Sequence, residues 1–142
     1  MIRLKSLKLT LIFNPLIFWV IEMNLAREFI KAREEYLKTK KEYERIREKA
    51  RKATNPLDQL VLAEKISVDE WAEKTVEIEF NLGLDDAHKR LIDAKDRLIK
   101  AGRRYIETQI TREEAEKIKE IWDCPLISIR DKIVDALLRL KV

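Results

Sequence analysis

Residues 25–53 read LAREFIKAREEYLKTKKEYERIREKARKA and repeat their apolar positions every seven residues. If Phe29 is placed at position a, the core positions of the repeat are mostly apolar: Phe29, Tyr36, Tyr43 and Ala50 at a, with Leu25, Ala32, Thr39, Ile46 and Ala53 at d. Such a repeat predicts a long helix with a narrow apolar face that packs against another helix. We call these a and d residues the heptad seam.

The heptad seam is flanked by acidic residues at its g positions and by basic residues at its e positions. In a parallel two-stranded coiled coil, each g residue faces the e residue five positions later in the partner, so all three acidic residues would meet a basic one. The pattern therefore predicts a homodimer or association with another helical protein. The expected interface combines Leu25, Phe29, Ala32, Tyr36, Tyr43 and Ile46 with Glu28, Arg33, Glu35, Lys40, Glu42 and Arg47.

A second heptad repeat offers the same glutamates partners inside the chain. Over about 85–107, leucines and a tyrosine recur every seven residues, and arginines stand beside them at Arg90, Arg97 and Arg104. In an antiparallel helix pair g faces g, so these arginines could meet the glutamates of the first repeat. The opposite flank of the second repeat carries His88, Lys95 and Gly102, which do not complement the basic e positions. Dimerisation and internal packing therefore both remain open.

Composition favours an all-α fold, a small helical bundle with a long heptad-patterned first helix. The 142 residues include only two glycines and three prolines, where average usage gives roughly ten and seven. Sandwiches and barrels need turn residues about every ten positions. The two glycines are also too far apart for a phosphate-binding loop or a dinucleotide fingerprint.

Capping signals divide the chain after residue 53 into shorter helices. Asn55-Pro56 predicts a break between a helix over about 24–53 and one over about 56–65. Ser67 with Glu70 and Thr111 with Glu114 have capping-box spacing. The further helices are expected from Ser67 to about Gly83, over 85–107, over 112–122 and, opened by Ser128 with Asp131, over 129–141. One inward stripe is expected on the third helix, formed by Val68, Trp71, Ala72, Thr75, Ile78 and Leu82.

The first 22 residues, MIRLKSLKLTLIFNPLIFWVIE, differ from the charged remainder, which we expect to form one domain over 23–142. Their apolar run is too short for the ~20 residues of a spanning helix. Three interpretations stay open. Residues 7–11 and 16–21 could pair as a hairpin, the segment could anchor the chain to a membrane surface, or translation could begin at Met23, which we prefer.

Charge and cysteine content limit the compartment and the class of partner that we expect for the protein. Charged residues make up 39% of the chain, which is typical of heat-adapted proteins. The single cysteine, Cys124, excludes an intrachain disulfide and indicates a reducing cytoplasm. Residues 23–142 carry 27 basic and 25 acidic side chains, a balance that argues against nucleic acid as the main partner.

Two acidic clusters raise an enzymatic alternative. Glu70 and Glu73 lie about one turn apart, and Asp93 and Asp96 follow with the same spacing. The pattern is similar to that of the all-helical nucleoside triphosphate pyrophosphohydrolases of the MazG type. That resemblance implies that these four residues would bind Mg²⁺, which prefers carboxylate oxygens. Their helical phase places them opposite the apolar faces, however, so a solvated acidic face is the better interpretation.

The sequence therefore predicts a non-enzymatic interaction or scaffold protein that self-associates through the heptad seam. It needs no cofactor, and no catalytic residues are assigned. The alternatives are the Mg²⁺-dependent pyrophosphohydrolase and a nucleic-acid-binding adaptor.

Overall fold

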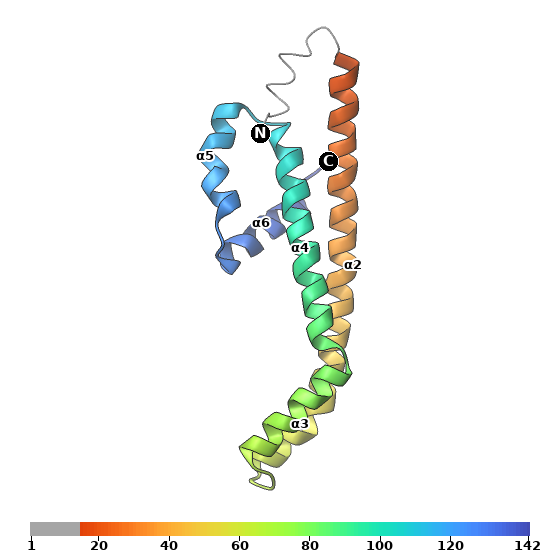
Figure 1. Ribbon diagram of the computed structural model, residues 1–142, viewed down its shortest axis with the longest axis vertical. Coiled ribbons are helices and arrows are strands. Elements are labelled where there is room, and N and C mark those ends of the chain that lie inside the picture. The colour runs from red at the N-terminus through yellow and green to blue at the C-terminus, as the bar shows by residue number, and fades with distance from the viewer. Residues whose placement is uncertain (1–14) are drawn as a thin grey trace. The chain divides into compact units, whose positions relative to one another are not determined.

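A computed structural model describes residues 15–142, and all of its regular structure is helical. The helices are α2 (Pro15–Leu62), α3 (Val68–Asn81), α4 (Leu84–Glu107), α5 (Arg112–Asp123) and α6 (Ile127–Arg139). Figure 1 shows their order along the chain. The predicted all-α class is confirmed. Within the described residues, no helix is long and apolar enough to cross a membrane.

The described chain divides into two compact units. The first joins the chain up to Tyr36 with Ala94–Val142, and the second comprises Leu37–Asp93. Helices α2 and α4 each contribute residues to both units, α5 and α6 belong to the first, and α3 belongs to the second.

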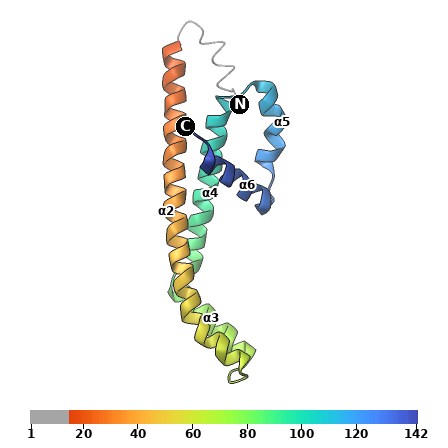
Figure 2. The ribbon, with the colours of Figure 1, turned by 180° about the vertical axis from the view of Figure 1, so that it is seen from behind.

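In the first unit, α2 and α4 lie side by side and α6 crosses them, as the two opposite views agree (Figures 1 and 2). The rings of Phe29 and Tyr105 stack with their centroids 5.5 Å apart. Leu98 of α4 is fully buried and Leu137 of α6 is 2% exposed. These side chains form a core between three helices, which fixes α6 on the α2–α4 pair.

A close helix contact at Gly102 explains how α6 approaches α4. A Cβ atom at this position would lie 2.6 Å from Cδ2 of Leu137. Glycine allows this close approach, because a larger residue would force the buried Leu137 side chain to shift. At the carboxyl end of α6, the Arg33 guanidinium donates to the carbonyl of Leu140 at 2.6 Å and to that of Leu137 at 3.3 Å. A cation at the final carbonyls of a helix also favours the helix dipole.

In the second unit, the final turns of α2 pack on α3. The indole nitrogen of Trp71 in α3 donates to the Asp58 carboxylate of α2 at 2.7 Å. Earlier in α2, the ring of Tyr43 lies 5.6 Å from that of His88 in α4. Ser67 caps α3 by accepting from the amide of Glu70 at 3.0 Å. Gly83, at a positive φ of 75°, forms the turn into α4. Glycine adopts this conformation without steric cost.

The predicted break at Asn55-Pro56 is wrong, because α2 continues through Pro56 to Leu62. Proline removes one hydrogen bond within a helix, at a cost of about 3 kcal/mol. The turn that follows Pro56 is stabilised by contact with α3, since Asp58 accepts the hydrogen bond from Trp71 and Leu57 is half-buried. Tertiary contact with α3 thus keeps these residues helical.

The start of α2 and the start of α6 also differ from the sequence prediction. Residues 16–21 are helical, so the hairpin, one of the three open interpretations of this segment, is wrong, and residues 7–11, its other strand, lie outside the described residues. Ser128 does not cap α6, which begins at Ile127 without a side-chain cap. Asp131, the expected capping partner, instead bonds Lys95 of α4 at 2.6 Å. The Thr111–Glu114 capping box of α5 is confirmed.

Candidate interaction surfaces

The heptad seam of α2 is largely buried within the single chain. Phe29 is fully buried, and Leu25, Tyr36, Ile46 and Ala50 are between 4% and 8% exposed. Ala32, Thr39 and Tyr43 are half-buried, whereas Ala53 is exposed. A dimer through this seam would therefore have to replace contacts that the chain already makes with itself.

Two of the three glutamates beside the seam pair with α4 in the first unit. Glu28 lies 3.2 Å from Arg104, and Glu35 lies 3.0 Å from Arg97. These are the pairs that the antiparallel arrangement of the two heptad repeats predicts. All four side chains are about half exposed, so each pair contributes only about 0.2–1 kcal/mol.

In the second unit, Glu42 pairs along its own helix with Arg45, at 2.5 Å. This charge-assisted hydrogen bond, followed by the charges of Arg45, Arg90 and Lys49, holds the pKa of Glu42 below its ordinary value of 4.5. Of the basic e residues, Arg33 binds the end of α6. Lys40 and Arg47 form no ion pair among the described residues.

The four carboxylates of the acidic alternative do not assemble into a metal site. Across residues 15–142, no three His, Cys, Asp or Glu side chains are grouped so that they could hold a metal ion. Glu70 pairs with Lys74 at 3.0 Å, and Asp96 pairs with Arg130 of α6. Glu70, Glu73 and Asp93 belong to the second unit, whereas Asp96 belongs to the first.

Helix α3 exposes an apolar surface that differs from the predicted inward stripe. The predicted inward stripe is only partly correct, because Trp71, Thr75, Ile78 and Leu82 are half-buried while Val68 and Ala72 are exposed. No residue of α3 is buried. The exposed apolar residues follow at intervals of four, and their exposed fractions are 66% for Val68, 66% for Val76 and 74% for Phe80, with Ala72 between them. We call Val68, Ala72, Val76 and Phe80 the apolar row of α3.

The spacing of the apolar row was visible in the sequence, but its exposure was not. Residues four apart lie on the same side of a helix, and this row is turned away from the stripe that faces α2. A helix with two apolar stripes can cover only one of them with a single neighbour. The sequence signal that would have found the row is the count of apolar residues on α3, which exceeds what one stripe needs.

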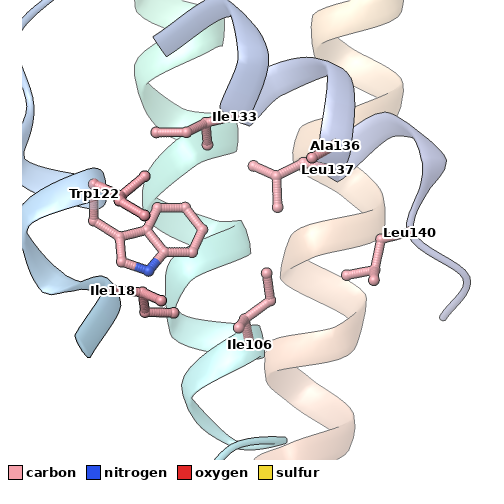
Figure 3. Close-up of a pocket in the computed structure, with 8 residues that line it drawn as sticks. Ile106, Ile118, Trp122, Ile133, Ala136, Leu137 and Leu140 are labelled. Atoms are coloured by element: carbon pink, nitrogen blue, oxygen red, sulfur yellow. The ribbon is translucent and has the colours of Figure 1, made fainter. Parts of the chain in front are cut away.

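An apolar pocket of about 240 Å³ opens in the first unit between α4, α5 and α6. Figure 3 shows Trp122 and Ile118 of α5 turned toward Ile133 and Leu137 of α6, with Ile106 of α4 at one side. The pocket is lined by Ile106, Ile118, Ile121, Trp122, Ile133, Ala136, Leu137 and Leu140. Its lining is almost entirely apolar, and the indole N–H of Trp122 is the one polar side-chain group in it.

The chain matches no known protein family, no curated protein and no solved structure. The geometry of its surfaces is therefore what supports a function.

Proposed function

We propose that this protein is a non-enzymatic helical interaction protein of the cytoplasm that binds another helix on the apolar row of α3. The observation that carries this proposal is the exposure of that row. Val76 and Phe80 keep 66% and 74% of their surface in water although their helix is well capped and regular. Contiguous exposed apolar surface on a folded domain is typical of a site for association.

The row has the geometry that helix-in-groove and helix-on-helix partners use. Apolar residues at intervals of three and four form the anchors of such complexes, and aromatic side chains supply much of the binding free energy. Phe80 is the largest exposed side chain of the row and stands near the carboxyl end of α3. It is the expected anchor residue.

Photo-crosslinking in the cell tests this function. A photo-crosslinking phenylalanine analogue in place of Val76 should form an adduct with a partner, and mass spectrometry should locate that adduct on a helical segment. The same analogue in place of Ile127, which is 74% exposed on α6, is the control. Adducts that are equally frequent at both positions, or absent from Val76, would contradict the proposal.

Self-association through the heptad seam is a second candidate, favoured by one observation. Lys40 and Arg47 lack ion pairs in the described part of the chain, and in a parallel dimer they would meet Glu35 and Glu42 of the other copy. Such a dimer requires that α4 leave its place on α2, as in an exchange of helices between copies.

A charge swap separates this dimer from internal packing. The double variant Glu28→Arg with Arg104→Glu restores the internal pair of the first unit with reversed signs. In the parallel dimer it opposes the new arginine to Arg33, so the dimer should weaken while the folded monomer persists. Light scattering on wild type and swap measures this. A wild-type monomer, or an equally stable dimer of the swapped chain, would contradict self-association through the seam.

A further inference from the structure

The apolar row of α3 runs beside a row of carboxylates. Asp69, Glu73 and Glu77 also follow at intervals of four, each one position after a member of the apolar row. Because residues four apart lie above one another on a helix, the two rows are parallel and adjacent. The exposed face of α3 therefore combines an apolar stripe with an acidic edge.

The charges of this edge are not neutralised by ion pairs within residues 15–142. Helix α3 carries Asp69, Glu70, Glu73, Glu77 and Glu79 against the single cation Lys74, which pairs with Glu70 at 3.0 Å. None of the three carboxylates of the acidic row forms an ion pair among residues 15–142. All three are exposed. They are thus free to meet the charges of a binding partner.

We propose, on the basis of the proposed function, that the partner of α3 is a basic amphipathic helix of another protein. Its apolar residues, spaced by three and four, would cover Val68, Ala72, Val76 and Phe80. A neighbouring row of Lys or Arg would lie along Asp69, Glu73 and Glu77. Apolar contact supplies affinity in such a complex, and the complementary charges set the partner choice and the orientation.

The same charges disfavour other occupants of the row. In an antiparallel pair of α3 helices from two copies, equivalent flanks meet, so the acidic rows would face each other. Like charges in that arrangement oppose association. A membrane surface rich in anionic lipids would repel the acidic row for the same reason.

Three synthetic amphipathic peptides of about 18 residues, a length that supports helix formation, test the proposal. They share one leucine row and differ only in the adjacent row, which is lysine, glutamine or glutamate. Binding of each labelled peptide to the full chain is followed by fluorescence anisotropy. We expect the lysine peptide to bind at least about tenfold more tightly than the glutamine peptide, and the difference to shrink with added salt. The glutamate peptide should bind least.

Two pairs of variants assign the binding to the two rows. The double variant Asp69→Lys with Glu73→Lys should reverse the preference, so that the glutamate peptide binds better than the lysine peptide. Glu44→Lys, an exposed charge reversal on α2, is its control and should leave the preference unchanged. Phe80→Ser should remove binding of all three peptides, whereas Ile127→Ser, at the same 74% exposure, should not.

The outcomes distinguish the partner class from the function. Equal binding of the lysine and glutamine peptides that is lost in Phe80→Ser would overturn the basic partner and keep the interaction surface. Binding of the lysine peptide that Phe80→Ser leaves unchanged would overturn both. Self-association of the full chain that Phe80→Ser abolishes would make a second copy the occupant and overturn the proposal. Reversal of the preference in the Asp69/Glu73 variant, with the wild-type preference kept in Glu44→Lys, supports it.

Discussion

Helices α3 and α4 are consecutive and both rich in apolar residues, yet only α4 has buried ones, although its Ile92 is 43% exposed. In α4, Ala87 and Ala94 are 1% exposed and Leu98 is fully buried, while α3 contains no buried residue. The difference follows from the number of neighbours. In the first unit α4 touches α2 through Tyr105 and α6 through Gly102, whereas α3 is held to α2 by its Trp71 side.

If α3 binds a partner as proposed, the residues that stabilise the fold and the residues that bind lie on different helices. Burial of apolar surface contributes roughly 25 cal/mol for each Å² removed from water, so the apolar residues of α4 stabilise the fold. The apolar row of α3 contributes little of this kind while it remains exposed. We therefore expect changes in α4 to affect folding and changes in the α3 row to affect association.

The largest expected effect is the difference in stability loss between a change in α4 and a change in the apolar row of α3. Leu98→Ala should lower the free energy of unfolding by about 2–5 kcal/mol, since it leaves a cavity in a fully buried site. Val76→Ala, at a side chain 66% exposed, should change it by no more than about 0.5 kcal/mol. Urea denaturation followed by circular dichroism measures both. Equal losses would show that the row of α3 is part of the core.

The contact between α4 and α6 gives the next effect. Gly102→Val should destabilise the protein by about 1–3 kcal/mol, because its Cβ would overlap Leu137. Gly102→Ala should cost less, since alanine favours a helix by about 1 kcal/mol over glycine. In a Leu137→Val background, which removes the overlapping Cδ atoms, Gly102→Ala should become stabilising. Denaturation of the four chains of this cycle tests the coupling, and additive effects would exclude Leu137 as the obstacle.

A buried hydroxyl on α3 offers a smaller effect of opposite sign. The Oγ1 atom of Thr75 is buried and has no hydrogen-bond partner among the described residues. Thr75→Val should therefore stabilise the protein by about 1 kcal/mol, as it removes an unsatisfied polar group and keeps the shape. The control is Thr108→Val just after α4, where the hydroxyl donates to the Tyr105 carbonyl at 2.6 Å. That change should destabilise by a similar amount, and a gain in thermal stability at both sites would show that the hydrogen bond of the hydroxyl does not decide the effect.

Most of the fold follows from local sequence signals, and the exceptions have tertiary causes. The heptad of α2, the Thr111–Glu114 box and the turn at Gly83 are short-range patterns that the structure retains. Pro56 is a strong local signal that contact with α3 overrides, and Asp131 leaves its expected capping role to bind Lys95. The exposure of the apolar row of α3 could not be predicted, because it depends on which helix covers each face. Spacing alone does not tell that Val68 is exposed and Trp71 half-buried.

The smallest effect concerns the charge environment that α4 creates on α2. The pKa of Glu42 lies below 4.5, chiefly because of the hydrogen bond from Arg45, and next through the charges of Arg45 and then Arg90 of α4. A lowered pKa means that the contribution of Glu42 to stability is present above its unfolded value. It is lost as the pH falls through the folded value.

Titration by NMR of the Glu42 carboxyl carbon measures that pKa directly. Arg45→Gln should raise it most, Arg90→Gln should raise it less, and Arg51→Gln should leave it unchanged because Arg51 pairs with Glu48. If Arg90→Gln raised it as much as Arg45→Gln, α4 would contribute as much to this carboxylate as its own helix does. The ionisation of Glu42 beside the heptad seam would then depend on α4, just as the burial of the seam residues does.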